Sequence, residues 1–131
     1  MLQFRECWKG LEGGTGELDA TELSRLIVQA IADKQGEDIL VLDLRRVSLL
    51  ADYFVLCSAG SDRQIKAVAD EIRTQCNEAG LHPLHVEGQP ESGWVLLDYG
   101  SVIAHLFSPK TRTHYDLERL WSQAPVVVRM Q

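Results

Sequence analysis

Apolar residues recur at helical spacing in two stretches of the chain, and each stretch follows a residue that can cap a helix. The first helix is predicted to begin at Asp19, because its carboxylate can accept amides of the first turn and Glu22 completes a capping pattern. Gly36 is expected to end this helix. The second is predicted to begin at Ser61 or Asp62 and to end at Gly80. The predicted buried faces are Leu23, Leu26, Ile27, Ala30 and Ile31 in the first helix, and Ile65, Val68, Ala69, Ile72 and Cys76 in the second.

Short apolar runs between these patterns predict about five strands. They cover residues 39–44, 52–58, 84–87, 94–98 and 102–107. The second run, the second helix and the third run form a strand–helix–strand unit, which predicts a parallel pair with a right-handed crossover. The link 45–51 is long enough for one helical turn.

The last two runs are separated only by Tyr99, Gly100 and Ser101, which predicts an antiparallel hairpin. A final short helix is expected over residues 115–122, with Tyr115, Leu117, Leu120 and Trp121 against the sheet and Glu118 and Arg119 in water. The fold class expected is α/β with mixed α+β character: a mixed sheet of about five strands, flanked by helices.

The chain of 131 residues suits one domain, with 45% hydrophobic and 24% charged residues. We predict a flexible leader at 1–18, where Trp8 is a candidate docking side chain, a domain at 19–125 and a C-terminal tail at 126–131. No apolar run approaches the roughly 20 residues that span a bilayer, and the leader lacks the features of a signal peptide. These features predict a cytoplasmic protein.

Three scattered cysteines, Cys7, Cys57 and Cys76, form no C-x-x-C pair, which disfavours a disulfide framework or a cysteine zinc site. Cys57 and Cys76 are better interpreted as small core residues. The formal net charge is -6, from 13 basic and 19 acidic residues. Since no cluster of lysine and arginine is present to grip phosphates, the charge favours a basic protein as partner.

Candidate chemistry is sparse. The turn at Gly60 and Ser61 lies where α/β folds hold phosphate, so a nucleotide-binding or nucleotidyl-transfer enzyme is the alternative hypothesis; the simpler interpretation is a turn and helix cap. Nucleotidyl transfer needs paired carboxylates for magnesium, but the hairpin strand offers only Asp98, and Asp70 and Glu71 are adjacent on a helix. No metal site or other cofactor is expected from the histidines, which are His82, His85, His105 and His114.

Residues 94–100 form the most distinctive stretch. On a strand, Trp94, Leu96 and Asp98 share one face, while Leu97 and Tyr99 share the other with Val95. Large apolar groups therefore occur on both faces. The pattern leaves two interpretations open: helices cover both faces, or one face is a partner surface with aromatic anchors.

Taken in order, several segments resemble the family of ribosomal silencing factors, also called Iojap-related proteins, over residues 19–125. The matching segments are 51–55, Gly60 and Ser61 with Arg63, 80–81, 83–88, 94–100, Val102, His105, Phe107 and 115–121. The chain departs from the family pattern at Ser101, where an acidic residue is frequent, and at Ala59, where threonine or glycine is usual. The second departure weakens any phosphate contact at the Gly60 turn.

The resemblance implies a fold related to nucleotidyltransferases without their catalytic carboxylates, and no enzymatic activity. It also implies binding to the large ribosomal subunit through its ribosomal protein number fourteen, which blocks association with the small subunit and represses translation under nutrient limitation. Self-association is common in the family. Organelle relatives assist large-subunit assembly, but Glu6, Glu12 and Glu17 make residues 1–18 unlike a transit peptide. The partner-binding residues implied are Trp94, Leu96, Leu97, Asp98 and Tyr99, with His85, Glu87 and His105.

Overall fold

The computed structural model of the chain describes residues 19–131, so Cys7, Trp8 and the predicted leader lie outside the described residues. Helix α2 (Ala20–Asp33) begins where the Asp19 carboxylate accepts a hydrogen bond from the Glu22 amide at 2.9 Å. Helix α3 (Asp62–Glu78) begins at Ser61, whose hydroxyl accepts from the amide of the third helical residue at 3.1 Å. Both predicted caps are confirmed.

The strands form one six-stranded sheet in the order β3-β4-β5-β2-β1-β6. Only β2 and β5 pair in parallel; every other pair of neighbours is antiparallel. The predicted hairpin of β4 and β5 is therefore confirmed. The strands are β1 (Glu37–Asp43), β2 (Tyr53–Ser58), β3 (His85–Gln89), β4 (Trp94–Asp98), β5 (Val102–Phe107) and β6 (Val126–Met130).

The sixth strand corrects two predictions, the count of about five strands and the C-terminal tail at 126–131. Strand β6 pairs antiparallel with β1, and Val128 is only 2% exposed within the core. The carbonyl of Pro125 accepts the amide of Asp43 at 2.9 Å, which ties the start of β6 to the end of β1. A run of three valines after a proline is too short to predict a strand with confidence from pattern alone.

The predicted parallel pair formed by the strand–helix–strand unit is wrong, because β3 does not lie beside β2. Strands β4 and β5 lie between them, and β5 pairs with β2. Burial explains the order: five of the six residues of β5 are buried, whereas all five residues of β3 are exposed. Strand β3 therefore fits the sheet edge, and the apolar hairpin strand fits the centre.

The predicted helix over 115–122 is instead two short helices, α4 (Pro109–Tyr115) and α5 (Leu117–Leu120), separated by Asp116 in the left-handed region at φ 47°. Helix α4 begins at Ser108 with proline in its first turn, a start signal that the sequence carries. Leu117 and Trp121 pack on the sheet as predicted, and Tyr115 packs against Trp94 of β4 while half exposed, but Leu120 is exposed. Glu118, predicted to lie in water, accepts a hydrogen bond from Arg112 Nε at 3.0 Å.

Gly36 follows α2 closely, as predicted, but for another reason than a left-handed backbone. Gln35 takes the left-handed conformation, with φ 62°. The Gly36 amide donates to the Ile31 carbonyl at 2.9 Å, which brings the two residues close together. A Cβ at Gly36 would therefore collide with the Ile31 side chain. The glycine is thus required by the close approach of helix and strand.

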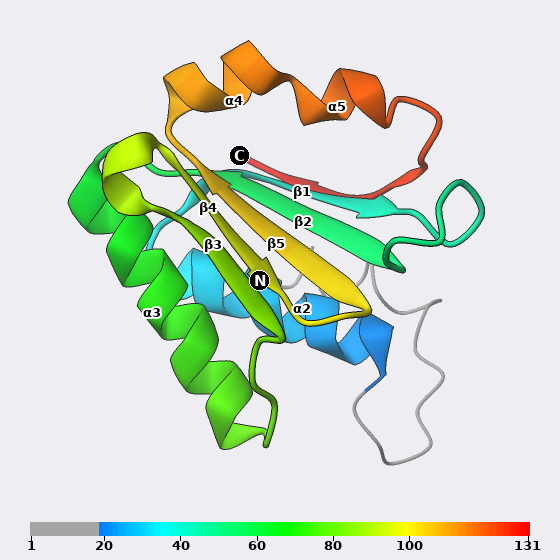
Figure 1. Cartoon of the computed structure of the whole chain (residues 1–131), viewed down its shortest axis with the longest axis horizontal. Coiled ribbons are helices and arrows are strands. Elements are labelled where there is room, and N and C mark those ends of the chain that lie inside the picture. Colours follow the sequence, from blue (N-terminus) through cyan, green and yellow to red (C-terminus); the bar gives the residue numbers. More distant parts are fainter. Residues whose placement is uncertain (1–18) are drawn as a thin grey trace.

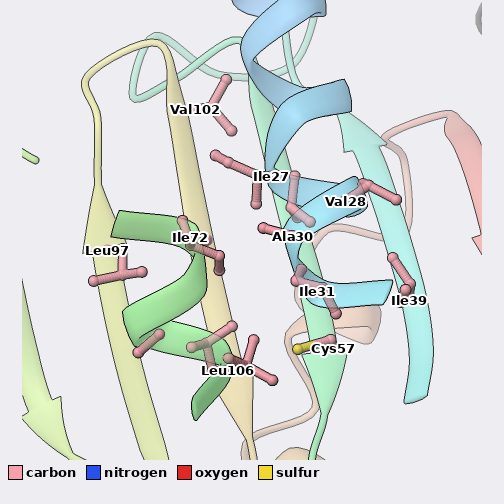
Figure 2. Close-up of a cluster of buried hydrophobic side chains, with 14 of the residues drawn as sticks. Ile27, Val28, Ala30, Ile31, Ile39, Cys57, Ile72, Leu97, Val102 and Leu106 are labelled. Carbon is pink, nitrogen blue, oxygen red and sulfur yellow. The ribbon is translucent and has the colours of Figure 1, made fainter. Parts of the chain in front are cut away.

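The core has two layers, one on each face of the sheet (Figure 1). Helices α2 and α3 cover one face, where Ile27, Ile31 and Ile72 share one buried cluster with Leu97 and Leu106 (Figure 2). Helices α4 and α5 lie on the other face, over a smaller cluster. Cys57 and Cys76 are buried in the larger layer, as predicted. In the described residues, no helix is both long enough and apolar enough to cross a membrane.

The role of β6 predicts unequal effects for two valines on the same strand. Val128→Ala removes buried methyl groups and is expected to lower the free energy of unfolding by about 2 kcal/mol. Val126→Ala, at a position that is half exposed, is expected to change it by less than about 0.5 kcal/mol. Urea denaturation of both variants measures the difference. Equal, small effects would mean that residues 126–131 do not form part of the sheet.

Candidate functional site: an open aromatic face of the sheet

Strand β4 presents two different faces. Val95 and Leu97 are buried on the face covered by α3, and Leu97 is 0% exposed. Trp94, Leu96 and Asp98 alternate with them and are only partly buried on the opposite face. Of the two interpretations that the sequence left open, helices on both faces and one accessible face, the structure supports the second for this part of the sheet.

The strand register brings further predicted site residues onto this face. On β3, His85 lies opposite Asp98 and Glu87 lies opposite Leu96; on β5, His105 lies opposite Leu96. Leu117 and Trp121, from and just after α5, pack over the cluster built on β1 and β2, so the helices leave the side chains of β3 and β4 accessible. We call the following residues the open face: His85, Glu87, Trp94, Leu96, Asp98 and His105.

A series of aromatic rings supports the open face. The Trp94 ring centroid lies 4.6 Å from that of Tyr115 and 5.1 Å from that of Phe107. The Trp94 and Phe107 rings stack. His105 lies edge-on to Phe54 at 4.7 Å. The rings therefore form a continuous support from helix α4 to the centre of the sheet, and they fix the position of the Trp94 indole.

His105 holds Trp94 through a hydrogen bond rather than presenting itself to a partner. The Trp94 indole Nε1 donates to His105 Nδ1 at 3.2 Å, which makes the imidazole an acceptor on that nitrogen. His105 is 4% exposed, and burial lowers its pKa to about 4. It is thus a neutral, buried residue that positions Trp94, and only its neighbours on the face are accessible.

The polar residues at the hairpin end are engaged with each other and with the backbone. The Asp98 carboxylate accepts the amide of Gly100 at 2.7 Å, and Gly100 has a φ of 89° that favours glycine. His85 Nε2 lies 2.6 Å from the Glu87 carboxylate, and both side chains are well exposed. Asp98 therefore shapes the turn, while Glu87 and His85 remain available to a partner.

A shallow cavity of about 250 Å³ opens beside Trp94 and Leu96. Gly88 forms part of its wall with φ 82°, and a Cβ there would collide with the Trp94 carbonyl. Tyr115, which the sequence predicts against the sheet, forms another part. Ser108 followed by Pro109 is a helix start signal in the sequence. It indicates a separate helix that ends at Tyr115, beside Trp94.

Two predicted site residues lie elsewhere. Leu97 is enclosed in the core, and Tyr99 packs against the same layer from the covered face. Burial and the neighbouring Cys76 thiol raise the pKa of the Tyr99 hydroxyl above its usual range. The structure thus brings six of the eight predicted residues together on one face and places Leu97 and Tyr99 on the other.

The Gly60 turn is occupied by its own helix. The amide of Gly60 donates to the Gln64 side-chain oxygen at 2.8 Å, and the Gln64 amide donates to Ser61 at 3.1 Å. The side-chain nitrogen of Gln64, Nε2, in turn donates to the backbone carbonyl of Gln35 at 2.8 Å. The amides of Gly60 and Gln64, two donors that a phosphate at this turn would use, are therefore already paired within the protein.

Metal and thiol chemistry find no support in the described residues. From residue 19 to residue 131, no group of three or more histidine, cysteine or acidic side chains is placed to hold a metal ion. Burial raises the pKa of the Cys57 thiol to about 12, so the reactive thiolate form is suppressed.

These features define a mixed α/β domain whose sheet has one helix-covered face and one partly open aromatic face. A family model described as "ribosomal silencing factor during starvation" matches residues 17–131. A ribosomal silencing factor of Bacillus subtilis is 41% identical over 109 residues, covering 83% of this chain and 92% of the relative. The chloroplastic Iojap protein of Zea mays is 31% identical, over 75% of this chain and 42% of the relative.

Solved structures agree with the sequence relatives. A crystal structure of a Chromobacterium violaceum protein superposes with a TM-score of 0.77 at 35% identity, covering 79% of this chain and 87% of that one. A Bacillus halodurans structure gives a TM-score of 0.72 at 36% identity, over 82% and 97% of the two chains. The chain belongs to the family of ribosomal silencing factors. The family has a regulatory role in translation, and the resemblance seen in the sequence is confirmed.

The buried His105 predicts a stability that depends on pH. Unfolding returns its pKa from about 4 to the ordinary 6.5, so between these values the unfolded state binds more protons. The stability contributed by neutral His105 is complete above pH 6.5 and is lost as the pH falls to about 4, by about 3 kcal/mol in total.

Urea denaturation across that pH window measures this effect, with His105→Gln as the comparison because glutamine keeps an acceptor for Trp94 and does not titrate. The wild type should lose stability more steeply than the variant as the pH falls, by up to about 1.4 kcal/mol per pH unit. Parallel pH profiles for the two proteins would contradict a buried neutral His105.

Proposed function

We propose that this chain binds the large ribosomal subunit with its open face and blocks association with the small subunit. The contact proposed on the subunit is its ribosomal protein number fourteen. Bound there, the chain represses translation by occupying space that the small subunit needs. The description of the matched family places this silencing during starvation, which agrees with repression under nutrient limitation.

One observation supports this proposal above the others: a tryptophan is held in place beside a leucine, on a sheet face that no helix closes. Trp94 and Leu96 are partly buried, and the hydrogen bond that the indole donates to His105, together with the Phe107 and Tyr115 rings, fixes the indole. Rigid aromatic anchors lose little conformational entropy on binding, so they are favoured at the centres of protein interfaces.

Charge favours a basic partner for this face. Glu87 lies beside the anchors with its side chain well exposed, and the whole chain has a formal net charge of -6. Ribosomal proteins contact RNA and are commonly basic, so complementary charge would speed and orient the encounter. The cytoplasm is the compartment that this proposal implies, and self-association is a further expectation for the free protein.

The alternative, a nucleotide-binding or nucleotidyl-transfer function at the Gly60 turn, finds less support. The amide of Gly60 is paired with the Gln64 side chain, and the Asp98 carboxylate binds its own hairpin. The relation of the fold to nucleotidyltransferases remains a prediction from family resemblance, and it carries no step of the proposal.

The proposal predicts that Leu96→Gln weakens binding to purified large subunits by about tenfold or more, because a central apolar anchor is replaced by a polar amide. Glu87→Lys is a second variant, which is expected to weaken binding by reversing the charge of a well-exposed side chain. Co-sedimentation measures both, after circular dichroism has shown that each variant is folded. Val126→Gln, on the opposite sheet edge, is the matched control and should bind like the wild type. Undiminished binding by both folded open-face variants would refute the site.

A further inference from the structure

The turn between β1 and β2 exposes apolar side chains that the fold does not use. Leu49 is fully exposed, Leu50 is 66% exposed and Val47 is 37% exposed. Single exposed leucines are common on protein surfaces, but three large apolar side chains within four residues of a turn are not. We call Val47, Leu49 and Leu50 the leucine turn.

The backbone of the leucine turn is held in one conformation. The Leu44 carbonyl accepts the amides of Val47 at 3.1 Å and Ser48 at 2.9 Å, which closes the single turn expected from the sequence. The Ser48 hydroxyl then accepts the amide of Leu50 at 3.0 Å. The two leucines are therefore displayed by a braced segment, which lowers the entropy lost when a partner covers them.

The turn borders the open face. Its roots, Leu44 and Ala51, are buried in the same cluster as Phe54, on the side of the sheet that carries Trp94. Beyond Ala51, the amide of Asp52 donates to the Ser101 carbonyl at 2.7 Å, next to the end of the hairpin. Figure 1 shows the turn projecting from the end of the sheet where β2 begins.

A half-buried residue joins the two surfaces. Ile103 on β5 lies between Asp98 of the open face and Phe54 of β2 in the strand register. It packs as a partly buried residue against the cluster that holds the roots of the turn. One partner could therefore cover Leu96, Ile103 and the leucine turn in a continuous contact.

The size of a stable interface also requires more surface than the open face provides. Specific complexes bury about 800 Å² on each partner, over roughly 20 residues or more. The open face has six residues, of which His105 is buried and Asp98 is bonded to its own turn. Tyr115 extends this surface beside Trp94, and the leucine turn extends it at the hairpin end, where the amide of Asp52 meets Ser101.

The nature of the partner follows from the charges beside the turn. Arg45 donates to the Asp43 carboxylate at 2.8 Å and its guanidinium lies 5.3 Å from the Tyr53 ring centroid. Because this cation is engaged, only Arg46 remains beside the leucines to meet a phosphate. An apolar recess of a protein therefore fits the turn better than ribosomal RNA does.

We propose that the leucine turn is the second half of the docking surface and inserts Leu49 and Leu50 into an apolar recess of the same large-subunit protein that the open face contacts. This inference rests on the proposed function. It assigns to residues 45–51 a binding role in addition to the connection between two strands.

The test is the double variant Leu49→Gln, Leu50→Gln, measured by co-sedimentation of the full chain with purified large subunits. Because both side chains are exposed, the variant should unfold at the same urea concentration as the wild type. Its binding is expected to weaken by about tenfold or more. Leu120→Gln, at another exposed leucine on α5, is the matched control and should bind normally.

The outcomes separate this inference from the proposed function. If Leu96→Gln loses binding and the leucine-turn variant does not, the inference is wrong and the proposed function stands. If neither loses binding, the proposed function itself is wrong. Sedimentation velocity gives a further outcome. If the wild type is a dimer and the leucine-turn variant is a monomer that still binds subunits normally, a second copy of the chain covers the turn, and the inference is overturned.

Discussion

The parallel pairing of β2 with β5 is the constraint on which the rest of the structure depends. All six residues of β2 are buried, and they pair in register with β5 from Tyr53 and Val102 to Ser58 and Phe107. A strand buried on both faces needs cover on both sides, which α2 and α3 supply on one face and Leu117 with Trp121 supply on the other. Since β5 takes the place beside β2, its hairpin partner β4 and the exposed β3 are displaced toward the edge.

That displacement creates the accessible surface. At the edge, β4 still needs α3 over Val95 and Leu97, but α4 and α5 are too short to cover both its other face and the central strands. Trp94 and Leu96 are left partly buried on a face that α4 and α5 cover only in part, with the Phe107 and Tyr115 rings against the Trp94 indole. The proposed docking surface thus follows from the order of strands and the lengths of two short helices, and it requires no strained backbone or bound group.

Much of this fold could be predicted from the sequence because the signals are local. Asp19 and Ser61 mark helix starts, and Tyr99 to Ser101 mark a hairpin. The strand order could not be predicted, because it depends on a competition between β3 and β5 for the place beside β2 that only burial decides. Strand β6 was missed since three valines carry no alternation to identify, although they complete the sheet beside β1.

The candidate site was predicted in part for the same reason. Alternation along β4 correctly separated Trp94 and Leu96 from Leu97 and Tyr99, but it could not say which face the helices would leave open. The role of His105 as a support for Trp94 depends on a contact between two strands, and so does the contribution of Tyr115 from α4. Such contacts have no signature in the spacing of residues along the chain.

Hydrogen–deuterium exchange of the full chain, free and bound to purified large ribosomal subunits, tests the central claim most directly. Binding through the open face should slow amide exchange in β3 and β4 and in the turn at 45–51, because a partner shields these edge segments from solvent. Exchange in the exposed half of α3 and in β6 should stay unchanged. Protection confined to α3 or β6, or none in β3 and β4 at saturating subunit, would contradict the account.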